Sequence, residues 1–159
     1  MTLESDSRKL AGFCAECQGK CCKGHHILLS KSEFMRLRKK KDFPSRRIDS
    51  PTGCAVMTVD ALSREKCPFL KDDGCEMKLE ERPLVCRLYP ITFTAEKGDV
   101  EFHLSKKCPY FEEVKELKNW IKTTLADAEK ELSTGWTKKE IKCFGSYLMK
   151  DKKNLAELP

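Results

Sequence analysis

Four cysteines crowd into nine residues near the start of the chain, in the stretch Cys14-Ala15-Glu16-Cys17-Gln18-Gly19-Lys20-Cys21-Cys22. Packing alone does not require such a group, because a buried cysteine behaves as a small hydrophobic residue. Thiolate sulfur is instead a preferred ligand of zinc, Cu(I) and iron–sulfur clusters. The stretch therefore indicates a soft-metal site whose other ligands come from later parts of the chain.

Eight of the ten cysteines are candidate metal ligands. Most of the eight lie close to glycine, proline or turn residues, outside the two helical patterns at the C-terminal end. They are Cys14, Cys17, Cys21, Cys22, Cys67, Cys75, Cys86 and Cys108. Cys143 lies within the last expected helix and Cys54 in a short β-like run, so both are assigned to packing. Eight thiolates are also the number that fills two four-thiolate sites.

Structural zinc and iron–sulfur clusters are the competing interpretations of these eight thiols. Zinc is usually held by paired C-x2-C knuckles, and only Cys14 and Cys17 form one here. The adjacent pair Cys21-Cys22 does not suit one small ion, because the side chains of neighbouring residues diverge. A 4Fe–4S cluster is wide and tolerates irregular ligand spacing. One or two 4Fe–4S clusters are therefore the favoured cofactor, and zinc is the alternative.

The composition is that of a globular chain of one domain, with 159 residues and an ordinary hydrophobic share of 40%. No apolar run approaches the roughly 18–20 residues of a membrane span. Residues 1–6 are acidic and polar and do not resemble a secretory signal. We therefore expect a cytoplasmic protein without membrane contact, in which thiols stay reduced and disulfides are the less favoured use of the cysteines.

The formal net charge of +6 comes from one segment. Residues 31–47 hold eight basic side chains against Glu33 and Asp42, which equals the whole excess. A helix dipole favours cations at its C-terminal end, and aromatic residues are sparse here, so a solvated helix face is the favoured interpretation. Binding of nucleic acid or an acidic partner through this segment is the alternative.

The elements that must position the cysteines form a small, metal-centred α+β fold. We expect cysteine-rich loops and short β-hairpins, with an N-terminal helix and two C-terminal helices. Residues 1–13 are expected to be a frayed or helical lead-in. Ser30-Lys31-Ser32-Glu33 and Thr137-Lys138-Lys139-Glu140 have the form of capping boxes, which predicts helices that begin there. Asp73-Gly74 predicts a tight hairpin turn.

The second half of the chain changes from a strand pattern to a helical one. Alternating residues predict a β-hairpin from 91–94 and 100–104. Apolar residues at three- and four-residue spacing then predict one amphipathic helix over 111–132, which Gly135 ends. The tail, residues 150–159, is expected to be loose.

The cysteines and their neighbours follow a recognisable order. C-x2-C-x3-C-C precedes Cys67-Pro68-Phe69-Leu70, Gly74-Cys75, Arg82-Pro83-x-x-Cys86-Arg87-x-Tyr89-Pro90 and Cys108-Pro109. This order resembles the YkgJ-type cysteine-cluster family, a zinc- or iron-chelating domain that is similar to a domain of flagellin lysine N-methylases. The resemblance covers about residues 14–110 and implies that the same eight cysteines are the chelators. One departure is Glu76-Met77-Lys78, where family members commonly carry a short apolar residue and a tyrosine.

We expect two parts, a cysteine-cluster metal-binding domain over residues 1–110 and a C-terminal helical extension over 111–159 packed on it. The favoured function is a 4Fe–4S protein that transfers electrons or assists a modifying or maturation system, together with a protein partner. A zinc-stabilised interaction module without catalysis is the alternative. An enzyme like the lysine methylases ranks third, because the sequence shows no cofactor pocket for it. No catalytic residue is identified.

Two further pairs of side chains have a functional and a structural interpretation. Arg82 and Arg87 could raise the potential of a cluster or hold a carboxylate, but pairing with Glu80, Glu81 or backbone carbonyls is favoured. The adjacent imidazoles of residues 25–26 could replace thiolates, yet eight cysteines make that unnecessary.

Overall fold

The computed structural model describes residues 2–17, 27–43, 45–49, 55–59, 67–72, 74–96 and 99–159. The helices are α1 (Leu3–Glu16), α2 (Lys31–Lys40), α3 (Leu84–Leu88), α4 (Phe111–Lys115), α5 (Lys118–Gly135) and α6 (Lys138–Leu148), with 3₁₀ turns η2 (Leu79–Glu81) and η3 (Met149–Asn154). The strands are β1 (Ile27–Leu29), β2 (Ser45–Asp49), β3 (Ala55–Val59), β4 (Leu70–Lys71), β5 (Gly74–Cys75), β6 (Ile91–Glu96), β7 (Asp99–Ser105) and β8 (Leu155–Glu157). The expected α+β class is confirmed.

The described strands form three small antiparallel sheets, in the orders β1-β3-β2, β4-β5 and β6-β7-β8. The predicted hairpin is present, with Phe93 opposite Phe102 in its centre. The tail is not loose, because β8 pairs along the edge of β7 and places Ala156 opposite Leu104. A short strand of this kind is stabilised by the edge that it covers, which its own sequence does not reveal.

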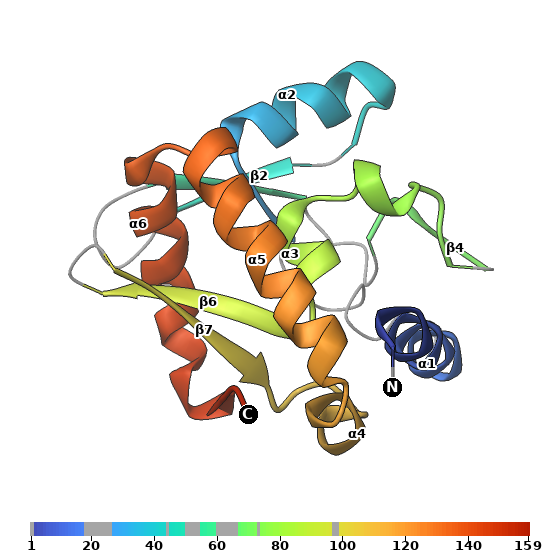
Figure 1. The fold of residues 1–159 in the computed structure, drawn as a ribbon. Helices are drawn as coiled ribbons and strands as arrows, with labels where there is room; N and C mark the ends of the chain where they lie inside the picture. The colour runs from blue at the N-terminus through green and yellow to red at the C-terminus, as the bar shows by residue number, and fades with distance from the viewer. Residues whose placement is uncertain are drawn as a thin grey trace.

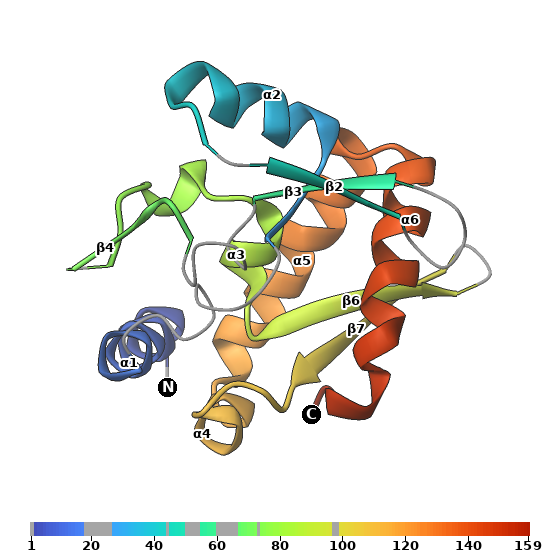
Figure 2. The ribbon, with the colours of Figure 1, turned by 180° about the vertical axis from the view of Figure 1, so that it is seen from behind.

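The main apolar core lies around the β6–β7 hairpin, which has α5 on one face and α6 on the other (Figures 1 and 2). Phe93 of β6 stacks on Phe144 of α6 with ring centroids 5.7 Å apart, and Trp136 meets Phe144 edge-on at 4.8 Å. Gly145 lets α6 approach β6 closely, since a Cβ at this position would lie 2.2 Å from the backbone nitrogen of Ala95. The position therefore has no room for a side chain.

The amphipathic pattern predicted over 111–132 is broken into two helices. α4 ends at Lys115 and α5 begins at Lys118, with the buried side chain of Leu117 between them. The residue before α5 provides no side-chain cap for the helix. The backbone N–H groups of Asn119 and Trp120, in the first turn of α5, donate instead to Asp6 of α1, a contact that the local pattern cannot show.

A second, smaller core lies beneath α2. Both predicted capping boxes are present, at Ser30 with Glu33 and at Thr137 with Glu140. Glu33 has a further contact, because its Oε1 accepts a hydrogen bond of 2.7 Å from the backbone N–H of Leu84 while Oε2 accepts from Ser30 at 3.0 Å. One carboxylate thus joins the beginnings of α2 and α3.

None of the helices in the described part of the chain is long and apolar enough to cross a bilayer. The division of the chain at residue 110 stays a prediction. Residues from both sides of that position share the main core, as the stacked rings of Phe93 and Phe144 show.

Candidate metal centre

Six of the eight candidate ligands belong to the described residues, and none of the six forms a disulfide. They are Cys14, Cys17, Cys67, Cys75, Cys86 and Cys108. Cys21 and Cys22 lie outside the described residues, as do Cys54 and the two histidines at positions 25–26. The six described thiols fall into two neighbourhoods.

The first neighbourhood is the helix-end group, which consists of Cys14, Cys17 and Cys108. All three line one cavity of about 50 Å³ between the end of α1 and the turn that follows β7. Cys14 lies in the last turn of α1, and Cys17 is its C-cap, with Sγ of Cys17 3.5 Å from the carbonyl oxygen of Cys14. Residues three apart share one face of a helix, so both thiols reach the same side of α1.

Cys108 faces these two thiols from the turn after β7. Burial raises the pKa of the Cys108 thiol above its ordinary value, the N–H of Tyr110 partly opposes this, and the nearby Cys17 adds to it. Cys17 and Cys108 also line the same small cavity. A cation would reverse this balance, because metal binding deprotonates thiols.

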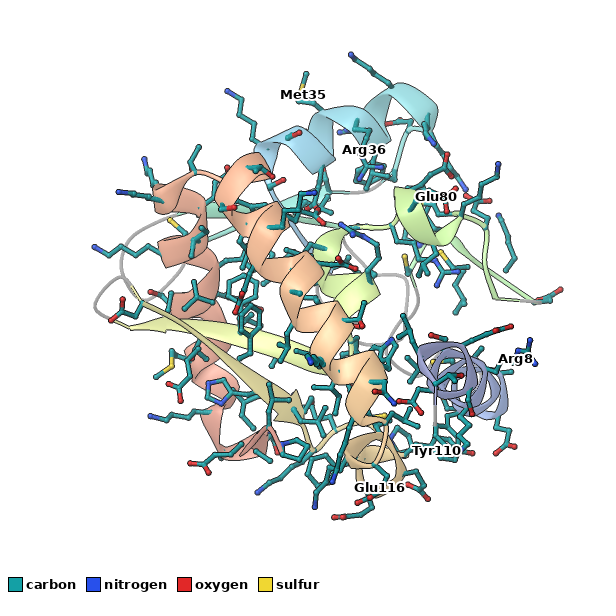
Figure 3. All side chains as sticks on the ribbon, in the orientation of Figure 1. Arg8, Met35, Arg36, Glu80, Tyr110 and Glu116 are labelled. Atoms are coloured by element: carbon teal, nitrogen blue, oxygen red, sulfur yellow. The ribbon has the colours of Figure 1, made fainter. Side chains whose placement is uncertain are left out.

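Tyr110 fixes the end of α1 against this turn. Its ring stacks on Phe13 with centroids 4.9 Å apart, and its Oη donates a hydrogen bond of 2.5 Å to Oε2 of Glu16. This hydrogen bond is the main reason why the pKa of Tyr110 rises to about 12. Figure 3 shows Tyr110 between α1 and α4.

Asp6 fixes the N-terminal half of α1 against the start of α5. It is 1% exposed, and its Oδ2 accepts hydrogen bonds from the backbone N–H groups of Asn119 (3.0 Å) and Trp120 (3.2 Å) at the start of α5. Its Oδ1 has no hydrogen-bond partner among the described residues. The sequence gives no signal for this role, because Asp6 reads as an ordinary acidic residue in the first turn of a helix and its partners lie more than a hundred residues away.

The second neighbourhood is the apolar group, which consists of Cys67, Cys75 and Cys86. Cys67 is a member of the second core, and the other two pack against that core together with Leu70 and Val85. Hydrogen bonds within the segment hold the group in place and join Leu70 N to Cys67 O (3.0 Å), Glu76 N to Phe69 O (2.8 Å) and Cys86 N to Pro83 O (3.0 Å).

Gly74 forms the turn that brings Cys75 back beside the segment of Cys67. Its φ of +119° is a conformation that side chains rarely allow, so the predicted Asp-Gly turn needs glycine here. Cys75 pairs with Leu70 across the short β4–β5 hairpin. The turn thus determines where one thiol of the apolar group lies.

The described residues contain no group of three His, Cys, Asp or Glu side chains already arranged to hold a metal ion. The thiols are gathered but do not form a closed ligand shell, and the set of eight ligands stays a prediction. The donor chemistry does fit zinc or iron, since six cysteines that form no disulfide lie in two places and soft metals prefer sulfur.

Cys143 differs from these six. It is buried in the main core, as a packing residue should be, but it also forms a disulfide, which the sequence does not predict. Cys143 is therefore not a free thiol for a metal.

The structural interpretation of the two arginines is confirmed. Nε of Arg82 donates to the carbonyl oxygen of Met77 at 3.1 Å, and Nε of Arg87 donates to that of Arg82 at 3.0 Å. The acidic partner of Arg87 is Glu131 of α5. The sequence favours Glu80 or Glu81 instead, because a partner from a distant helix is not visible in local spacing.

Several cations of the basic segment are paired within the fold. Lys40 forms an ion pair with Glu81, and Arg36 donates to the carbonyl oxygen of the same residue at 2.6 Å. Lys41 pairs with Glu76 at 2.7 Å, and that hydrogen bond is the main reason why the pKa of Glu76 is lowered. Partner binding through this segment stays a prediction.

A scan against protein families matches residues 13–117 to CxxCxxCC, described as a "Putative zinc- or iron-chelating domain". The searches of curated proteins and of solved structures found no match. The matched region includes all eight candidate ligands and excludes Cys143. It covers more than half of the 159 residues, and the chain therefore belongs to the CxxCxxCC family.

Proposed function

We propose that this chain binds 4Fe–4S clusters through its cysteines and serves as an electron-transfer or accessory component of a modifying or maturation system. The observation that supports the proposal is the pair of cysteine neighbourhoods, each with three cysteines that form no disulfide. The family description allows zinc or iron. Irregular ligand spacing and adjacent cysteines favour a wide cluster over one small ion.

The position of the helix-end group on α1 also favours a bound cation. Cys14 and Cys17 lie at the C-terminal end of the helix, whose last turn contains no basic residue. The helix dipole disfavours negative charge there, in contrast to the N-terminal positions at which thiolates are stabilised. Two thiolates at this end therefore need positive charge from a metal centre.

A bound metal centre would have a different solvent exposure in each of the two neighbourhoods. A bound cluster supplies one-electron transfer. Cys67 is buried in the second core and Cys75 and Cys86 are half-buried, whereas Cys14 is exposed and opens the helix-end group to solvent. The exposed end of α1 is where we expect a protein partner to approach and exchange electrons.

A zinc-stabilised interaction module is the second candidate. The Cys14–Cys17 spacing, which matches one half of a zinc site, favours it. In this function the metal would hold α1 and the turn after β7 together without any redox step.

Metal analysis separates the two functions. The full chain is purified without oxygen, and iron, acid-labile sulfide and zinc are measured beside the visible spectrum. Brown protein that contains iron and sulfide supports the proposal, whereas colourless, zinc-loaded protein overturns it. Cys86→Ser should lower the metal content and Cys143→Ser should not, with circular dichroism to verify that both variants are folded.

A further inference from the structure

Helix α3 carries Cys86, and it is too short to determine its own orientation. It has five residues, and isolated helices shorter than about 12–15 residues are marginal in water. Pro83, which precedes it, provides no side-chain cap. The position of the Cys86 side chain must therefore come from the contacts that α3 makes with other elements.

Three contacts hold α3 along one face and at its beginning. Leu84 and Leu88 lie four residues apart on the same face and are buried in the main core. The backbone N–H of Leu84 also donates to Oε1 of Glu33 at 2.7 Å. Cys86 follows Leu84 by two residues, so it lies on the roughly opposite face, where it packs against the second core. A rotation of α3 about its axis would move Cys86 from this place.

Arg87, the residue after Cys86, joins α3 to two further segments. Its Nε donates to the carbonyl oxygen of Arg82 at 3.0 Å, and its Nη2 forms an ion pair with Oε2 of Glu131 in α5. α3 and α5 are neighbours in the fold (Figures 1 and 2). One planar guanidinium thus holds both the chain that enters α3 and the helix beside it.

The Arg87–Glu131 pair is more enclosed than a typical surface pair. Its side chains are 25% and 29% exposed, against 77% and 74% for the Arg8–Glu4 pair of α1. Exposed pairs contribute little, because water and salt screen the charges and both side chains lose freedom on pairing. An enclosed pair is screened less, and loss of one partner leaves the other charge partly desolvated. This pair should therefore restrain α3.

A hydrogen bond continues from this pair toward the next cysteine. Nε of Arg82 donates to the carbonyl oxygen of Met77 at 3.1 Å, and Met77 is a buried member of the second core two residues after Cys75. The ion pair thus acts on Cys86 through the adjacent residue and on Cys75 only through this further step. Its loss should affect Cys86 more than Cys75 or Cys67.

We propose that Glu131 is a positioning residue for Cys86, because it holds Arg87 and so fixes the rotation of α3. Residue 131 lies outside the region 13–117 that matches the family, so the family description assigns it no role. The inference rests on the proposed function only for the role of Cys86 as a metal ligand. The helix that follows the matched domain thereby takes part in building the cysteine site.

Thiol alkylation of the metal-free full chain tests the positioning role. Metal is removed with a chelator under anaerobic conditions, and the rate at each cysteine is measured by mass spectrometry under native conditions. Glu131→Ala should raise the ratio of the Cys86 rate to the Cys67 rate about fivefold, which is about 1 kcal/mol at tenfold per 1.4 kcal/mol. Glu131→Gln should keep this ratio close to that of the wild type, because its amide oxygen can accept from Arg87.

Glu129→Ala, at an exposed glutamate of the same helix, is the matched control and should leave the ratio unchanged. A mere loss of overall stability would speed the alkylation of both thiols alike. A wild-type ratio in Glu131→Ala, whether both rates rise together or neither changes, would therefore overturn the positioning role.

Metal retention separates this inference from the proposed function. Each chain is reconstituted anaerobically with iron and sulfide, and the iron that it retains is measured against a competing chelator. Glu131→Ala should bind iron about tenfold more weakly than the wild type, as expected when a group that orients a ligand is removed. Unchanged retention would overturn the positioning role. A wild-type chain that binds no iron would instead contradict the proposed function, while the alkylation ratio would still decide whether Glu131 holds Cys86.

Discussion

The two cysteine groups are held by different means. The helix-end group joins the beginning of the chain to the turn after β7, and it exists only while α1 is docked. The apolar group lies within residues 67–86 and is supported by hydrogen bonds inside that segment and by a buried core. The first should therefore respond to changes in docking, and the second to changes in apolar packing.

A buried carboxylate supports the helix that carries cysteines in each of the two groups. Asp6 of α1 accepts hydrogen bonds from the first amides of α5, and Glu33 of α2 accepts one from the first amide of α3. In both cases the carboxylate lies on one helix and accepts hydrogen bonds at the beginning of another, so it joins the two helices. One of the joined helices carries cysteines, α1 in the first case and α3 in the second.

Removal of the Phe69 ring should have the largest effect. Phe69 is 3% exposed and packs edge-on against Phe43 at 5.4 Å. Phe69→Ala should lower the free energy of unfolding by about 3–5 kcal/mol, because it leaves a cavity in the second core. Denaturant titration measures this loss, and exposed Leu79→Ala is the control.

The Phe69→Ala variant also tests whether the two cysteine groups respond separately. Thiol alkylation under native conditions should accelerate at Cys67, Cys75 and Cys86 far more than at Cys14. Equal acceleration in both groups would show that the two cores are one cooperative unit.

Loss of the Asp6 carboxylate should act on the other group. Asp6→Ala leaves the amides of Asn119 and Trp120 without an acceptor, which should cost about 1–3 kcal/mol of stability. Metal bound by the helix-end group should be lost, while Cys67, Cys75 and Cys86 stay protected from alkylation.

Asp6→Asn is the matched control, since it keeps one carbonyl oxygen that can accept from α5. It should preserve most of the stability and the metal. If Asp6→Ala exposed the apolar group to alkylation as fast as the helix-end group, the docking role of Asp6 would be wrong.

Glu33 should produce a modest pH dependence. Burial raises its pKa above the ordinary 4.5, against the opposing hydrogen bonds from Leu84 and Ser30. Below about pH 4.5 the acid is protonated in both states, and as the pH rises through the raised pKa the unfolded chain releases its proton first. The stability of the wild type relative to Glu33→Gln should therefore fall with rising pH in this window.

Glu76 is the control with the opposite sign. Its pKa is lowered, chiefly by the hydrogen bond from Lys41, so its contribution is present above pH 4.5 and is lost as the pH falls through the lowered pKa. The difference between wild type and Glu76→Gln should thus rise with pH. The same sign for both variants, in urea titrations at several pH values, would contradict these assignments.

Local features of the fold could be predicted from the sequence, and distant ones could not. The two capping boxes and the glycine turn at Gly74 depend on residues within three or four positions, and all are present. Asp6 accepts hydrogen bonds from the first turn of α5 just after the break from α4, and β8 pairs with the edge of β7. Both contacts join segments whose own patterns carry no sign of the partner.

The same distinction applies to the candidate site. The kind of ligand is visible in the sequence, because four cysteines in nine residues have few other uses. The grouping is not visible, because Cys17 and Cys108 line one cavity only after α1 has docked on α5 and on Tyr110. The local set of Cys67 and Cys75 is closer to what spacing can show, since one tight turn joins them.

The smallest effect is expected from the Tyr110 hydroxyl. Tyr110→Phe removes the hydrogen bond to Glu16 and keeps the ring that stacks on Phe13, so α1 should remain docked and both cysteine groups should keep their metal. Tyr110→Ala removes the ring as well and should speed alkylation of Cys14 and Cys17 without changing that of Cys67 or Cys86. Equally fast alkylation of Cys14 and Cys17 in both variants would mean that the hydroxyl, and not the stacked ring, holds this end of α1.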